Sequence, residues 1–213
     1  MRGLVLAAGL LSTIPAPLRA QVEIDNAWVR VLRLVQGSHE KSSALPRGAT
    51  VLVYLTDCHQ RVTDSRGESQ EISRKAGDVI YENSGLQAAE NLSDQPLEVV
   101  MIELKAPPAQ AKTTPVALDP VKLDPEHHIV VIENDRVRVL RTILEPHVPA
   151  PMHEHPHYVV VYVTGLHTTM QMADGRNVDN VRKPGEIAWR DPLKHATENV
   201  GDRTAIEIQV ELK

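Results

Sequence analysis

The stretch Pro151–Gly165 reads PMHEHPHYVVVYVTG and places histidines at three alternate positions, His153, His155 and His157. Residues two apart in a β-strand point to the same face of a sheet, so these side chains are expected to share one side. The valines that alternate beyond them continue that side, and an all-valine face indicates the interior of a barrel. Several neutral imidazoles that converge on an interior face favour a bound metal, because they otherwise lack polar partners.

A third ligand must come from a more distant strand, and the sequence offers His195, which follows the turn Lys183–Gly185 and a short strand-like stretch. We expect His153, His155 and His195 to hold a divalent metal; the alternative is a hydrogen-bonded histidine cluster without one. His157 is expected on the same side as the pair before it. Its candidate roles are a fourth ligand, a group that supports the ligands, and a catalytic general base.

The chain repeats itself at a fixed offset of 108 residues. The matching segments are Asn26–Arg33 with Asn134–Arg141, Val51–Thr56 with Val159–Thr164, and Glu103–Lys105 with Glu211–Lys213. A stretch rich in proline and alanine separates the two copies and has the composition of an extended linker. We therefore expect an N-terminal domain over residues 21–105, a linker over 106–127 and a C-terminal domain over 128–213.

Within each copy, short runs of β-branched residues alternate with turn residues, which predicts strands. No amphipathic stretch has the length of a convincing helix. Many short strands without helices indicate an all-β protein, here two tandem barrels, since closing a sheet into a barrel removes its exposed edges.

The second copy resembles the cupin family of small barrels built on a double-stranded β-helix. The matching residues are His153, His155 and Gly165 in the first motif, and Pro184, Gly185, His195 and Asn199 in the second. Through the internal repeat the resemblance extends to the first copy and implies a bicupin. The glutamate that the first motif usually carries is replaced by Val159. The implied ligand set is therefore three histidines, as in some cupin dioxygenases.

The first copy serves as an internal control, because other residue types occupy all three ligand positions. They are Leu45, Arg47 and Gln87, in the order of His153, His155 and His195. Histidines needed only for folding have no reason to vanish as a set, whereas metal ligands do. The sequence thus predicts a metal site in the C-terminal domain alone.

The same comparison assigns simpler roles to other polar residues. Arg138 and Arg141 recur in the first copy, so they are expected to be solvated or paired residues of strands. His127 and His128 stand at the end of the predicted linker and are expected at the surface.

The composition excludes some classes of partner, and the first twenty residues indicate the location of the protein. A net charge of −5 over 213 residues, without a basic cluster, argues against nucleic acid or an anionic membrane as partner. Arg2, the apolar run 4–14 and a small-residue region before Gln21 resemble a signal peptide over residues 1–20. We expect a periplasmic or secreted protein, for which the single Cys58 offers no intrachain disulfide.

These observations lead to one expectation and one alternative. We expect an exported bicupin that binds a divalent metal, with Fe2+ favoured over Mn2+, Ni2+, Cu2+ or Zn2+, and that acts on a small molecule. The resemblance implies a dioxygenase, although related barrels also serve isomerases, decarboxylases and lyases. The alternative is a metal-binding or small-ligand-binding protein without turnover, in which any metal is structural. A homodimer of two such chains is a further expectation.

Overall fold

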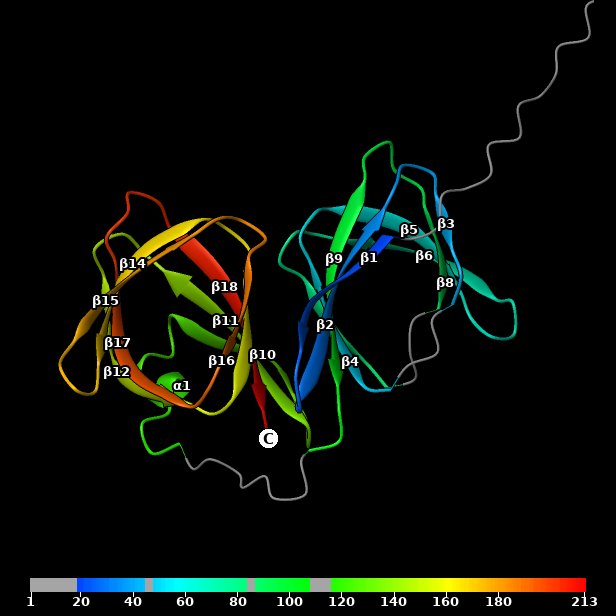
Figure 1. Ribbon diagram of the computed structural model, residues 1–213. Helices are drawn as coiled ribbons and strands as arrows, with labels where there is room; N and C mark the ends of the chain where they lie inside the picture. The colour runs from blue at the N-terminus through cyan, green and yellow to red at the C-terminus, as the bar shows by residue number, and fades with distance from the viewer. Residues whose placement is uncertain (1–18, 45–47, 84–86, 108–115) are drawn as a thin grey trace, which may run out of the picture.

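The computed structural model describes residues 19–44, 48–83, 87–107 and 116–213. It is built almost entirely from strands, as the alternating sequence patterns predict (Figure 1). The predicted signal peptide lies outside the described residues except for Arg19 and Ala20, which begin β1 (Arg19–Asp25). In the described part of the chain, no helix has the length and apolar character needed to cross a membrane.

The N-terminal half forms two antiparallel sheets. The five-stranded sheet has the order β1-β2-β9-β4-β7, with β2 (Val29–Gln36), β9 (Leu97–Leu104), β4 (Thr50–Tyr54) and β7 (Val79–Glu82). The four-stranded sheet has the order β3-β8-β5-β6, with β3 (Lys41–Ser42), β8 (Ala88–Asn91), β5 (Cys58–Thr63) and β6 (Ser69–Arg74).

The C-terminal half repeats this arrangement strand for strand. Its five-stranded sheet has the order β10-β11-β18-β13-β16, with bounds His128–Glu133, Val137–Leu144, Ala205–Leu212, Tyr158–Tyr162 and Ile187–Arg190. Its four-stranded sheet has the order β12-β17-β14-β15, with bounds Pro149–His155, Leu193–Asn199, Leu166–Met172 and Asn177–Arg182. Figure 1 shows the two halves side by side.

The largest apolar cluster lies between the two five-stranded sheets. It joins valines of β2, β4 and β9 to valines of β11, β13 and β18, and it includes Val159 and Val161. The expectation that these valines face a barrel interior is therefore wrong: they pack one half of the chain against the other. The interior of the C-terminal barrel is lined instead by the alternate residues of β13, Tyr158, Val160 and Tyr162.

Two arginines cross this interface in a reciprocal manner. Arg33 Nη2 donates to the carbonyl of Gly185 at 2.6 Å, and Arg141 Nη2 donates to the carbonyl of Gly77 at 2.7 Å. Both glycines have positive φ, +80° and +87°, in tight turns that an L side chain would strain. Arg141, expected on a strand as a solvated or paired residue, thus holds the two halves together, as does its counterpart Arg33.

The end of the predicted linker is folded. The helix α1 (Pro120–Leu123) begins at Asp119, whose side chain caps it by accepting from the Val121 amide at 3.2 Å. Glu154 of β12 accepts hydrogen bonds from the amides of Ala117 and Leu118 at 2.8 and 3.3 Å. Residues 116–127 therefore pack on the C-terminal barrel and do not form an extended linker.

Candidate metal centre

The three predicted ligands come from two neighbouring strands. β12 and β17 pair antiparallel, and His153 lies directly opposite His195 in their register. His155 is two residues further along β12, so its side chain points to the same face of the sheet as that of His153. Pairing of distant strands thus brings together residues that the sequence separates by about forty positions.

The three side chains form a compact, buried cluster. One ring nitrogen from each of His153, His155 and His195 lies within 4.8 Å of the other two. The rings of His153 and His195 have centroids 4.6 Å apart, and those of His153 and His155 are 4.8 Å apart. Exposure is 2% for His153, 1% for His155 and 5% for His195. Such proximity of buried donors is typical of a metal site.

Each ring is oriented by a hydrogen bond at its Nδ1 atom. His153 Nδ1 lies 2.7 Å from the carbonyl oxygen of Pro151, and His155 Nδ1 lies 2.7 Å from Oε1 of Glu211. His195 Nδ1 lies 3.0 Å from the hydroxyl of Thr197. A carbonyl and a carboxylate accept, so Nδ1 of His153 and of His155 donates and Nε2 keeps its lone pair.

The Nε2 atoms provide the test of whether a metal fits. Nε2 of His155 and Nε2 of His195 are buried and have no hydrogen-bond partner among the described residues. A buried polar atom without a partner is costly, and a cation that accepts its lone pair removes that cost. Three imidazoles with anchored Nδ1 atoms are the donor set expected of a divalent transition metal. The residues therefore fit the group.

Burial keeps these histidines neutral. It lowers the pKa of His195 to about 2, with the neighbouring histidines contributing, and it lowers the pKa of His153. Burial also lowers the pKa of His155 well below its ordinary value. A metal ligand must be unprotonated, so the cluster is prepared to bind a cation at neutral pH.

Glu211, a polar residue behind His155, was missed by the sequence analysis. Glu211 is 2% exposed and bonds both His155 and Arg138, the latter at 2.5 Å, and Arg138 in turn meets Asp119 at 2.9 Å. Glu103 and Arg30 form a looser counterpart in the first half, 3.8 Å apart. Arg138 and its counterpart Arg30 are therefore both paired strand residues, as expected. Only the second half adds a ligand histidine to the pair.

His128 is buried, whereas the sequence analysis expected it at the surface. It is 1% exposed, and its ring lies 5.0 Å from that of His153. Burial and the nearby His153 lower its pKa to about 4. The turn around Asp124 encloses it, with the Asp124 carboxylate 3.4 Å from Nδ1. Its neighbour His127 is partly buried and lies 2.6 Å from Asp124.

The structure places His157 away from the cluster. β12 ends at His155 and β13 begins at Tyr158 in the other sheet, so Pro156 and His157 interrupt the alternation. The His157 ring stacks with Trp189, with centroids 5.4 Å apart, and lies 4.6 Å from Trp28 of the first half. The side chain thus faces the contact between the two halves.

A small polar cavity adjoins the histidine cluster. It measures about 30 Å³, and its lining includes His153, His195, Tyr158, Arg190 and Glu207. Burial raises the pKa of Glu207 to about 7, against 4.5 for an exposed carboxyl. A carboxyl that titrates near neutral pH can take up or release a proton beside the cluster. The sequence offered a signal for both carboxyls, because the alternation of β18 places Glu207 and Glu211 on the same face of that strand.

The N-terminal half offers no comparable cluster among its described residues, because the only group of this kind found there or elsewhere in the described chain is His153, His155 and His195. Gln87, at the position of His195, is exposed just before β8. Leu45 and Arg47 lie outside the described residues.

No family model matches the sequence, and no curated protein matches it. Solved structures do match in fold. AerE from Microcystis aeruginosa has a TM-score of 0.65 and 10% identity, over 96% of this chain and 95% of that one. A cupin 2 conserved barrel domain protein from Leptotrichia buccalis has a TM-score of 0.58 and 12% identity, over 95% of this chain and 92% of that one. Oxalate decarboxylase of Bacillus subtilis, described with Mn(II) centres, has a TM-score of 0.54 and 11% identity, over 94% of this chain and 78% of that one.

At these identities the likeness concerns the fold. The chain has the fold of a two-domain cupin, a bicupin, with a candidate three-histidine metal site in its C-terminal barrel.

Proposed function

We propose that this chain is a metal-dependent enzyme that acts on a small anionic molecule at its C-terminal barrel. One observation carries the proposal: in the described part of the chain, the buried Nε2 atoms of His155 and His195 lack hydrogen-bond partners beside a polar cavity, while the Nδ1 atoms of the three ligands are anchored. His153, His155 and His195 would hold the metal. A bound Fe2+, the metal we favour, supplies Lewis acidity and one-electron chemistry with dioxygen.

The reaction class we favour is dioxygenation. Three neutral ligands leave the full charge of the metal uncompensated, which favours an anionic or enolate-like substrate. Decarboxylation is the nearest alternative reaction, supported by the shared fold of the Mn(II) oxalate decarboxylase of Bacillus subtilis. In either reaction the same histidines would hold the metal.

The residues around the cavity supply the remaining chemistry. Arg190 donates to the Tyr162 hydroxyl at 3.3 Å and gives the cavity a positive charge, which favours a carboxylate. Burial raises the pKa of Glu207 to about 7, so this carboxyl can exchange a proton with the substrate near neutral pH. A cavity of about 30 Å³ admits only a small group next to the histidines.

The first test is metal content. The protein, purified without an affinity tag, is analysed for metals next to a His153→Ala, His155→Ala double variant. His39→Ala, His59→Ala serves as the control, because both of these histidines are exposed surface residues paired with carboxylates. We expect one metal per chain in the wild type and the control and none in the double variant. Absence of metal from all three, after loading with Fe2+, Mn2+, Ni2+, Cu2+ and Zn2+ in turn, would overturn the proposal.

A second candidate function is metal binding without turnover, with a structural metal. His128 favours it, because this fourth buried histidine packs edge to face on His153. X-ray absorption separates the two candidates. An enzyme site keeps exchangeable water ligands and tolerates His128→Gln, whereas a closed structural site shows four protein ligands and loses the metal in that variant.

We also propose that residues 1–20 direct export and that the mature protein works in the periplasm or outside the cell. The support is the sequence pattern of a short basic start, an apolar run and small residues before Gln21. Amino-terminal sequencing of the protein recovered from an exporting bacterium tests this. A mature chain that still begins at Met1 would overturn it. Formation of a homodimer is a further proposal, which light scattering of the purified protein would decide.

A further inference from the structure

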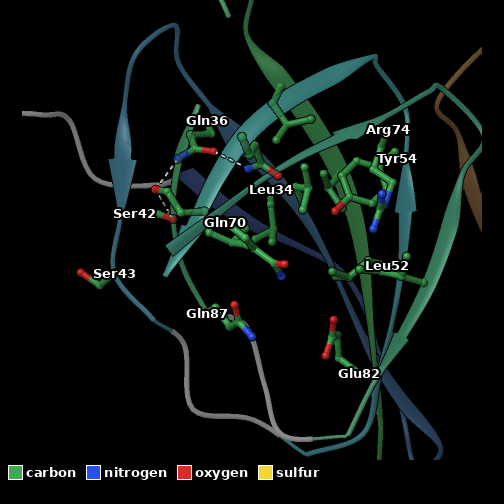
Figure 2. A pocket seen from close by; sticks show the side chains of 17 residues that line it. Leu34, Gln36, Ser42, Ser43, Leu52, Tyr54, Gln70, Arg74, Glu82 and Gln87 are labelled. Carbon is green, nitrogen blue, oxygen red and sulfur yellow. Dashed lines mark hydrogen bonds between the residues drawn. The ribbon is translucent and has the colours of Figure 1, made fainter. Parts of the chain in front are cut away.

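The interior of the N-terminal barrel holds the larger cavity of the two halves. It measures about 140 Å³, against about 30 Å³ beside the histidines. Figure 2 shows the side chains that line it. An engineered apolar cavity of about 150 Å³ in another protein binds benzene. The space in this barrel is therefore large enough for a molecule of one ring with small substituents.

Three positions in the wall of this cavity are apolar where the second half has polar side chains. Leu34, Ile72 and Val99 line it, and the repeat places Thr142, Asn180 and Glu207 at the corresponding positions of the C-terminal barrel. Each exchange replaces a polar side chain by an apolar one. A barrel that had merely lost its function would have no need to keep an open interior, since close packing of the same apolar residues would stabilise it more.

The polar groups of the cavity are mostly uncharged. Gln36 and Gln60 are buried and bond each other at 2.9 Å, so they form a satisfied polar wall. Gln70 and Gln87 add further amides (Figure 2). Carboxamides both donate and accept, which suits hydroxyl or amide groups on a ligand.

The charged groups balance one another. Arg74 and Glu82 both line the cavity and carry opposite charges, and Figure 2 shows Arg74 near the top and Glu82 near the bottom of the view. A net neutral molecule is therefore preferred to an anion or a cation. A metal has no role here, because Gln87 replaces the ligand His195 and the candidate ligand cluster of the described chain lies in the other half.

We propose that the N-terminal barrel is a metal-independent binding site for a small neutral organic molecule, one ring in size, with an apolar body and a hydroxyl or amide substituent. This site is separate from the proposed metal site, so its test does not depend on the proposed function.

The probe is para-fluorobenzyl alcohol, followed by fluorine NMR on the full chain. Its charged analogues para-fluorobenzoate and para-fluorobenzylamine are measured alongside. We expect one saturable site per chain for the alcohol and binding weaker by about tenfold or more for both ions, a difference of about 1.4 kcal/mol. Absence of saturable binding by the alcohol, or equal binding of the three probes, would overturn the proposal.

Matched variants locate the bound probe. Val62→Phe fills the N-terminal cavity, and Met170→Phe places the same side chain at the corresponding position of the C-terminal cavity. Gln87→Trp is a second blocking variant, chosen because Gln87 is exposed and its replacement should leave folding intact. We expect both blocking variants to abolish saturable binding and Met170→Phe to retain it.

A variant without the metal ligands completes the design. The His153→Ala, His155→Ala protein should bind the probe with the affinity of the wild type, even if the proposed metal function proves wrong. Loss of probe binding in this variant or in Met170→Phe, with retention in Gln87→Trp, would place the probe in the C-terminal barrel and overturn the inference.

Discussion

Glu211 and His155 form a buried pair in which Oε1 of the carboxylate accepts from Nδ1 of the imidazole at 2.7 Å. The pair joins two strands, β12 and β18, that belong to different sheets of the C-terminal barrel. It fixes the tautomer of His155 and directs Nε2 towards His153 and His195. Carboxylates in this position typically strengthen the basicity of a ligand histidine and hold its ring in place.

Replacing Glu211 by glutamine should therefore weaken metal binding. The amide keeps the volume of the side chain but loses the charge that His155 and Arg138 share. We expect affinity to fall by about 10- to 100-fold, measured by competition with a chelator of known affinity. Glu103→Gln, at the corresponding position of the first half, should leave affinity unchanged. Equal losses in the two variants would mean that the effect comes from folding rather than from the ligand.

Glu207 should make stability depend on pH. Burial raises its pKa to about 7 from 4.5, so the folded protein binds this proton more tightly than the unfolded chain. The free energy of unfolding should therefore fall as pH rises from 4.5 through about 7, by up to about 3 kcal/mol from this group.

The variant Glu207→Gln isolates this effect, because an amide does not titrate. Urea unfolding at pH values below and above this range should show the variant gaining stability relative to the wild type on the alkaline side. Glu68→Gln, at an exposed carboxylate, is the control and should follow the wild type. A difference between wild type and Glu207→Gln that does not change with pH would contradict the raised pKa.

His157 should contribute to the contact between the two halves rather than to metal binding. Its ring packs on Trp28 and Trp189, so truncation removes stacking and buried area. We expect His157→Ala to lower the free energy of unfolding by about 1–3 kcal/mol and His157→Phe to restore most of it. Metal content should be that of the wild type in both. Loss of metal in His157→Phe would instead support the ligand role considered from the sequence.

Gly77 should tolerate alanine less well than Gly67, although both have φ near +85°. A Cβ at Gly77 would lie 3.2 Å from Nη1 of Arg141, whereas one at Gly67 would meet no atom of the described residues within 4 Å. Gly67→Ala therefore measures the backbone cost alone, about 1–2 kcal/mol. We expect Gly77→Ala to lose about 1 kcal/mol more, because it also displaces the hydrogen bond of Arg141 across the interface. Equal losses by urea unfolding would mean that Arg141 shifts without cost.

The sequence alone determined the duplicated architecture and the three histidines. A fixed offset of 108 residues requires two similar folds, and loss of the three histidines as a set from one copy marks them as a functional group. Alternation within β12 correctly places His153 and His155 on one face. These inferences depend on local periodicity and on comparison within the chain, which one sequence contains in full.

Tertiary structure decided the surroundings of these histidines. Pro156 and His157 connect strands of two different sheets, so the alternation does not continue, and Val159 and Val161 of β13 face the other half. His128 is enclosed by a turn that looks like linker in sequence, and Glu211 reaches His155 from the far end of the chain. The way in which the sheets close on one another determines which side chains share a buried volume. The periodicity of a single strand does not specify that closure.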